Sequence, residues 1–198
     1  MNRVAVGVLL VVLAACSEPP ADPEEPHPSP SATRMEDVQR DAALRNELVA
    51  MMEEDQAERT GGGVIADGAR VARLKEIIEE HGWPTFDLVG RRGADAAWLI
   101  AQHADLDPEF QRTALLLLRE AAATGQASPG NLAYLEDRVA VADGQPQAYG
   151  TQMQCTPAGP PVPRTPIRAR SGLAERRAEA GLPPYASYLR EMSALCRG

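Results

Sequence analysis

The sequence lacks the short motifs that mark the large enzyme classes. It contains no G-x-S-x-G elbow, no phosphate-binding P-loop, no H-E-x-x-H zinc motif and no glycine-rich dinucleotide fingerprint. No internal repeat is evident either. No pattern of this kind assigns a reaction. A functional site must therefore be sought among individual polar side chains and their positions in the sequence.

Positive charge is also scarce. The chain has 20 Lys and Arg residues against 28 Asp and Glu, a net charge of -8. The only local cationic run is formed by Arg164, Arg168 and Arg170. A surface of this kind discourages nucleic acid and anionic lipid headgroups as partners, because it would release few counterions from their phosphates. We therefore expect no nucleic-acid partner.

Cysteine is limited to three positions, Cys16, Cys155 and Cys196. None of them has a neighbour in the C-x-x-C spacing of metal sites. In an oxidising compartment, two cysteines far apart in sequence can close a disulfide. We predict a bond between Cys155 and Cys196, which argues against a thiol nucleophile.

The apolar run at the N-terminus is too short to span a membrane. It extends from Val4 to Ala15, follows a single Arg3, and ends in LAAC. LAAC resembles the bacterial lipobox, in which the cysteine becomes the first mature residue and carries lipid. The sequence predicts a lipoprotein signal peptide at residues 1–15 and a membrane anchor on Cys16. The alternative is an ordinary signal peptide with an incidental cysteine.

Residues 16–34 have the composition of a tether. SEPPADPEEPHPSPSAT is crowded with proline and acidic residues and has no large apolar side chain. It cannot bury enough surface to offset its chain entropy, so we expect a disordered spacer. Together with the signal, this predicts an exported, membrane-anchored lipoprotein facing the periplasm or the cell exterior.

Residues 35–198 are expected to form a single, mainly α-helical (α+β) domain of about five to seven helices with one β-hairpin. Apolar spacings of three and four predict helices over about 35–59 and 67–81, the second with Asp67 as its N-cap. A nearly all-apolar helix is expected over about 94–104, buried rather than amphipathic. Further helices are predicted after the caps Asp107 and Ser128, with two more near the C-terminus. The four consecutive leucines after Asp107 place that helix in the interior.

The segment RVAVADGQPQAYGTQ predicts the β-hairpin, at about residues 138–152. Asp143 and Gly144 would form its two-residue turn. One face of the hairpin would then collect Arg138, Gln147 and Tyr149. A polar face of this kind is either the solvated side of the hairpin or part of a site.

The stretch AAWLIAQHAD places Gln102, His103 and Asp105 at the end of an apolar helix. Buried polar groups need partners. Asp55 and Arg59, on the apolar stripe of the first helix, can supply them, and so can the polar face of the hairpin. We predict that His103 contacts both groups beside a cleft. The alternative is a purely structural polar network in the core.

Five pieces of sequence in this order resemble a bacterial family known only as a domain of unknown function, with exported and lipoprotein members. They are EDQAER, GWP, QHADLDPEFQ, YLEDRV and QAYGTQ. The resemblance covers about residues 44–152, with a fainter match at RRAEAGLPPYASYL. It implies site positions and no reaction. These positions are Asp55, Arg59, Trp83, Gln102, His103, Asp105, Asp137, Arg138, Gln147, Tyr149 and Gln152.

Three functions are compatible with these residues. The first is an envelope protein whose polar pocket binds a small or anionic ligand or a protein partner. The second is a metal-independent hydrolase or transferase in which His103 is the general base, Asp55 or Asp105 orients it, and Arg59 or Arg138 holds an anion. The third is a structural envelope lipoprotein. We expect no metal or other cofactor, because no spacing supplies the three ligands of catalytic zinc.

Overall fold

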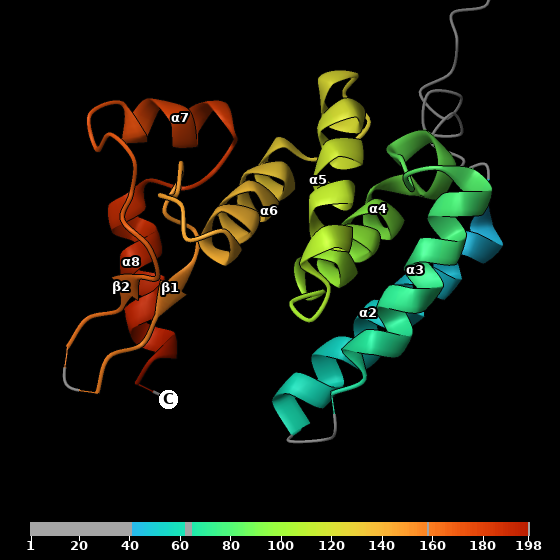
Figure 1. The fold of residues 1–198 in the computed structure, drawn as a ribbon, viewed down its shortest axis with the longest axis horizontal. Helices are drawn as coiled ribbons and strands as arrows, with labels where there is room; N and C mark the ends of the chain where they lie inside the picture. The colour runs from blue at the N-terminus through green and yellow to red at the C-terminus, as the bar shows by residue number, and fades with distance from the viewer. Residues whose placement is uncertain (1–40, 62–64, 158, 198) are drawn as a thin grey trace, which may run out of the picture. The chain divides into compact units, whose positions relative to one another are not determined.

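The computed structural model describes residues 41–61, 65–157 and 159–197. The predicted signal peptide, the tether, the anchor at Cys16 and the start of the first predicted helix lie outside these residues. The described part contains seven helices and one two-stranded sheet, so the predicted mainly helical fold is confirmed (Figure 1). The elements are α2 (Ala42–Gly61), α3 (Asp67–His81), α4 (Phe86–Gln102), α5 (Pro108–Ala123), α6 (Pro129–Ala142), β1 (Met153–Gln154), β2 (Val162–Pro163), α7 (Leu173–Glu179) and α8 (Tyr185–Leu195).

Two of the predicted helix caps are confirmed. The carboxylate of Asp107 accepts a hydrogen bond from the backbone N–H of Phe110 at 3.0 Å, and Pro108 is the first residue of α5. The Ser128 hydroxyl accepts from the N–H of Asn131 at the start of α6. Asp67, predicted as a third cap, is instead the first residue of α3. Its carboxylate is therefore available for contacts with other elements.

The hairpin predicted at residues 138–152 is wrong. The Ser128 cap starts a helix that continues to Ala142, so the apparent strand at 138–142 is the last part of α6. Asp143 and Gly144 end this helix: the N–H of Gly144 donates to the carbonyl of Val141, and the φ of Gly144 is +67°. An Asp-Gly pair serves a helix C-terminus as well as a hairpin turn, because glycine adopts the left-handed conformation that both require. The two-stranded sheet lies later, where Met153 pairs with Pro163 and Gln154 with Val162.

Helix α4 organises the core, because it packs against α2, α3, α5 and α6. It begins at Phe86, earlier than the predicted residue 94, and non-helical backbone angles at Gly90 interrupt it. The leucine run of α5 is only partly interior, since Leu118 is buried but Leu116 is exposed. The largest fully buried apolar side chains are Leu48, Leu74, Ile77, Val89, Ile100, Leu118 and Leu135.

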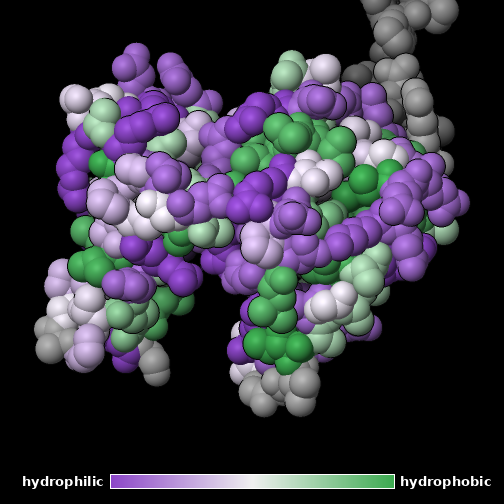
Figure 2. Space-filling view, in the orientation of Figure 1, coloured by the Kyte–Doolittle hydropathy of each residue, from purple (hydrophilic) through white to green (hydrophobic). Residues whose placement is uncertain are grey.

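The residues after α6 are joined to each other by backbone pairing and a disulfide. Gln147 forms a parallel bridge with Ile167. Cys155, next to β1, is bonded to Cys196 at the end of α8, as predicted. Hydrophilic side chains cover much of the face shown in Figure 2, with apolar patches between them. Within the described residues, no helix combines the length and apolar character needed to cross a bilayer.

Candidate functional site beside His103

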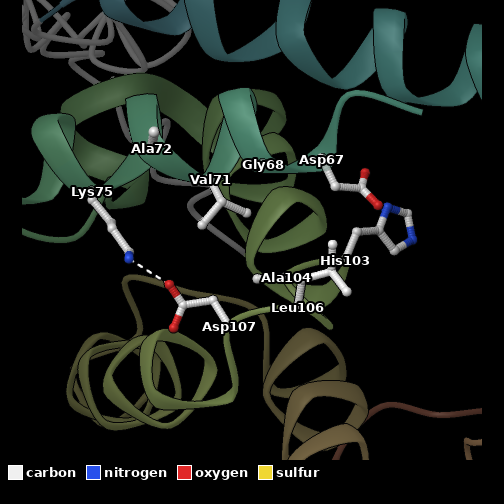
Figure 3. A pocket seen from close by; sticks show the side chains of 9 residues that line it. All are labelled: Asp67, Gly68, Val71, Ala72, Lys75, His103, Ala104, Leu106 and Asp107. Carbon is white, nitrogen blue, oxygen red and sulfur yellow. Dashed lines mark hydrogen bonds and ion pairs between the residues drawn. The ribbon is translucent and has the colours of Figure 1, made fainter. Parts of the chain in front are cut away.

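A pocket of about 260 Å³ opens where the start of α3 meets the connection between α4 and α5 (Figure 3). Val71, Ala72 and Leu106 give it apolar walls, and Leu106 is 92% exposed. His103 stands on one side of this pocket, near the end of α3 that carries Asp67. The complete lining is Asp67, Gly68, Val71, Ala72, Lys75, His103, Ala104, Leu106 and Asp107.

The core positions His103 through the end of α4. The last helical residue is Gln102, and the N–H of His103 donates to the carbonyls of Leu99 and Ile100 at 3.1 and 3.2 Å. Because the preceding turns of α4 are buried, the backbone of His103 is fixed at the point where the helix leaves the core. Its side chain can therefore reach both the pocket and the facing helix α2.

Asp55 reaches His103 from the apolar stripe of α2, as the spacing of the stripe predicted. It follows Leu48 and Met51 on the buried face of the helix and is 1% exposed. Both carboxylate oxygens lie 3.0 Å from Nδ1 of His103. Arg59 also donates to both oxygens through Nε, at 3.1 Å each. The carboxylate therefore holds the imidazole and the guanidinium together.

The second ring nitrogen of His103 is not engaged. Within the described residues, Nε2 has no hydrogen-bond partner. When Nδ1 carries the proton that it shares with Asp55, Nε2 has a free lone pair and acts as an acceptor. This is the arrangement in which a carboxylate orients a histidine for binding or for proton abstraction.

Burial controls how these two groups ionise. Burial lowers the pKa of His103 below its ordinary value of 6.5; the Asp55 carboxylate raises it and the positive charges of Arg59 and Arg138 lower it, and the net effect is downward. Burial raises the pKa of Asp55, but hydrogen bonds from Arg59 and His103 outweigh this and leave the pKa below 3.8. At neutral pH, Asp55 is ionised and His103 is neutral.

The other charged groups around the pocket are paired. Nη2 of Arg59 lies 2.6 Å from Asp67, and Nη2 of Arg70 lies 2.6 Å from Glu58. Lys75 is paired with Asp107 across the pocket, as the dashed line in Figure 3 shows. Among the described residues that line the pocket, His103 thus keeps a free acceptor nitrogen, Nε2, whereas the charge of Lys75 is already neutralised by Asp107.

Arg138, which was expected on the hairpin, forms a second cluster on α6. Its guanidinium binds Asp105 twice, through Nε at 2.9 Å and Nη2 at 2.8 Å. Nε also donates to the carbonyl of Gln102, and Nη1 donates to Oε1 of Gln152. The side-chain oxygen of Gln102 is buried and has no hydrogen-bond partner in the described part of the chain. Arg138 therefore joins the end of α4 to the segment before β1.

Asp137, the neighbour of Arg138 on α6, fixes the loop from Ala148 to Thr151. Its fully buried carboxylate accepts from the N–H groups of Ala148, Tyr149 and Thr151 at 2.6, 3.1 and 2.8 Å, and from the Thr151 hydroxyl at 3.0 Å. Gly150 is required between them, because its φ is +68° and an added Cβ would lie 2.6 Å from Ile167. This cluster has a structural role.

The remaining predicted site residues also lie away from the pocket. Gln147 is fully buried and bonds to the backbone of Gln152 in both directions. The ring of Tyr149 is near Glu136, and burial together with that carboxylate raises the pKa of Tyr149. Trp83 belongs to the apolar core and is 6% exposed. Among the described residues, the His103 ring bonds to Asp55 and forms no hydrogen bond with Arg138, Gln147 or Tyr149. The hairpin that was expected to bring those three residues to His103 is not formed.

Sequence reasoning missed the charged residues that line the pocket besides His103. Asp67 and Asp107 were interpreted only as helix caps, and Lys75 carried no signal. In the part of the chain that the structure describes, no group of three or more His, Cys, Asp or Glu residues could hold a metal ion.

Comparison with known proteins identifies the family. No curated protein and no solved structure matches this chain. A model described as a family of unknown function (DUF6624) matches residues 63–195. This match includes His103, Asp105, Asp137 and Arg138, extends to the end of α8, and leaves Asp55 and Arg59 outside. The match covers well over half of the sequence, and the chain belongs to this family of unknown function.

Proposed function

We propose that the protein is an envelope lipoprotein, anchored through Cys16, whose His103 pocket binds a small ligand that donates a hydrogen bond. One observation supports this most strongly: His103, whose Nδ1 is occupied by Asp55 and whose Nε2 has no partner among the described residues, is one of the residues that line a pocket of about 260 Å³. Ligand sites characteristically place a few oriented polar groups on a largely apolar wall.

The chemistry of the lining favours a neutral donor over an anion. Nε2 of neutral His103 accepts a hydrogen bond, so it suits a hydroxyl or N–H group. The charged side chains of the lining are paired, Asp67 with Arg59 and Lys75 with Asp107, so no unpaired cation among the described lining residues is left to hold an anion. Val71 and Leu106 would contact an apolar part of the ligand. A small molecule with one donor and one apolar face fits both features.

Three aromatic probes test this binding site on the full chain carrying Cys16→Ser. Phenol offers a donor and an apolar ring, toluene has no donor, and benzoate is anionic. In NMR titrations, phenol should shift the signals of His103, Val71 and Leu106 at lower concentration than the other two. His103→Gln should abolish that preference, whereas His81→Gln should not. Equal responses to all three probes would overturn the proposed chemistry.

Anchoring is tested separately, by mass. The mature wild-type protein should carry lipid on Cys16, and Cys16→Ser should remain unlipidated. A lipid-modified mass in the Cys16→Ser protein would contradict the lipobox interpretation.

The Asp55–His103 pair also supports a second candidate, a hydrolase or transferase with His103 as general base. The described residues that line the pocket include no Ser, Thr or Cys. The nucleophile would therefore be water or a hydroxyl of the substrate. With p-nitrophenyl acetate as probe, His103→Gln should reduce the rate by about 10²-fold or more. Equal rates in the wild type and the variant would exclude this role for that probe.

A further inference from the structure

The C-terminal segment, residues 145–197, differs in charge from the rest of the described chain. It holds seven arginines and three glutamates, whereas residues 41–144 hold ten basic and nineteen acidic residues. Every ion pair between described residues lies before residue 144. The positive charge of the C-terminal segment is thus not neutralised by contacts with described carboxylates.

Arg176 fixes the loop that carries two of these arginines. Its guanidinium donates to the carbonyls of Ala148, Arg168 and Ala169 at 3.0, 2.9 and 3.0 Å. The φ of Ala169 is +41°, in the left-handed region that non-glycine residues seldom adopt. Arg168 and Arg170 flank this residue, and both are exposed. The loop therefore presents its arginines from a fixed backbone.

A groove of about 440 Å³ lies beside Arg170. Among the described residues, Arg170 is the only charged one that lines the groove, and no described carboxylate lines it. The other lining residues come from α7, α8 and their connection: Leu173, Ala174, Ala178, Leu182, Pro184, Tyr185 and Ala186. An apolar surface with a single cation at its edge is thus exposed on this segment.

Arg177 adds positive charge next to the groove. It is fully buried, and its Nε and Nη1 donate to the carbonyls of Pro183 and Tyr149 at 2.8 and 2.7 Å. Among the described residues, its Nη2 has no hydrogen-bond partner, and its guanidinium carbon lies 5.7 Å from the centre of the Tyr185 ring. No described carboxylate forms an ion pair with it, although the charge of Asp137 acts on it from a greater distance. Arg177 therefore adds a positive charge close to Tyr185.

We propose that this groove binds an anionic phospholipid, with Arg170 holding the headgroup phosphate and the apolar residues contacting the acyl part. One guanidinium group can donate two parallel hydrogen bonds to two oxygens of a phosphate. The apolar lining requires an apolar part of the ligand, which free phosphate lacks. The single ring of Tyr185 provides no stacking run for a nucleic acid. The expectation that the surface charge discourages anionic lipid headgroups rests on the net charge of the whole chain, whereas this segment carries an excess of arginine.

Monomeric short-chain lipids test this site on the full chain carrying Cys16→Ser. In NMR titrations, dihexanoyl phosphatidylglycerol should shift the signals of residues 170–186. Dihexanoyl phosphatidylcholine and inorganic phosphate, at the same concentration, should not. Equal shifts with the neutral lipid, equal shifts with phosphate, or no shifts below micelle formation would each overturn the proposal. The site shares no residue with the His103 pocket, so its failure leaves the proposed function untouched.

Variants locate the contact. Arg170→Ala should weaken binding of the anionic lipid by about tenfold or more, because it removes a charge-assisted contact. Ala178→Glu, at an exposed position of α7, places a carboxylate in the groove and should weaken binding similarly. Arg190→Ala removes an arginine of the same segment that does not line the groove, and should leave affinity unchanged within about twofold. Unchanged affinity in both groove variants would contradict the assignment.

Discussion

Two buried carboxylates, Asp55 on α2 and Asp137 on α6, show how similar residues can serve different ends. Asp137 accepts only from the loop that it fixes, and its neighbour Arg138 is bonded to Asp105, Gln102 and Gln152. Asp55 instead holds His103, which lines a pocket and retains a ring nitrogen without a partner among the described residues. The difference lies in whether hydrogen-bonding capacity remains on a residue that lines a cavity. That capacity, more than burial or charge, separates a candidate site from a structural network.

Replacement of Asp137 should cause the largest loss of stability. Asp137→Ala leaves three backbone N–H groups and the Thr151 hydroxyl without their acceptor, and should lower the free energy of unfolding by about 3–5 kcal/mol. Urea unfolding of the full chain measures this. The control is Asp143→Ala, because Asp143 makes only a surface ion pair with Arg112, and its loss should change the free energy of unfolding far less. Equal losses would show that Asp137 has no special structural role.

Loss of the disulfide should have the next largest effect. Replacing Cys155 and Cys196 by alanine releases a loop with a sequence separation of 41 residues. This should lower the free energy of unfolding by about 3–4 kcal/mol. The His103 pocket should still bind phenol, since no pocket residue lies in this loop. Thiol labelling of the unfolded, unreduced mature wild type should find neither cysteine; labelling of both would refute the bond.

Arg138→Ala should affect both clusters, lowering the stability of the one that Arg138 holds together and changing the pKa of His103 in the other. Loss of its bonds to Asp105 and Gln152 should lower the free energy of unfolding by about 2–3 kcal/mol. Since the charge of Arg138 lowers the pKa of His103, the variant should also raise that pKa. Arg119→Ala, which removes a surface pair with Glu136, is the control for both readouts. A pKa unchanged by Arg138→Ala would mean that the two clusters are independent.

The smallest effect concerns pH. Because the pKa of His103 is lowered in the folded state, the unfolded chain takes up the proton first as pH falls below 6.5. The free energy of unfolding should therefore decrease between pH 6.5 and the folded pKa, and His103→Gln should remove this part of the decrease. Asp55 stays ionised in this window, since its pKa is below 3.8. Parallel pH profiles for the two proteins would contradict the lowered pKa.

Local sequence signals predicted much of the fold. Caps at Asp107 and Ser128, and the stripe that ends in Asp55, fixed three helices correctly. The error at residues 138–152 arose because β-branched Val139 and Val141 followed by Asp-Gly fit a strand and turn as well as a helix end. Tertiary packing resolved this ambiguity by burying Val139 against the core.

The site was only partly predictable, because sequence spacing cannot rank long-range contacts. The pairing of Asp55, Arg59 and His103 followed from two buried helix faces that carried polar residues. The opposite wall of the pocket comes from α3, whose Asp67 and Lys75 resemble any solvated helix residues in sequence. Only the packing of α3 on α4 brings them to His103.

We infer that His103 is a neutral hydrogen-bond acceptor that Asp55 orients and that a ligand can reach. The most direct test is a pH titration of the His103 ring nitrogens by NMR, in the wild type and in Asp55→Asn. At pH 7 we expect a proton on Nδ1 and none on Nε2, and we expect the pKa of His103 to lie below 6.5. In Asp55→Asn the pKa should fall further, because the carboxylate favours the charged ring. A pKa of His103 at or above 6.5 in the wild type, or a proton on its Nε2 at pH 7, would contradict this inference.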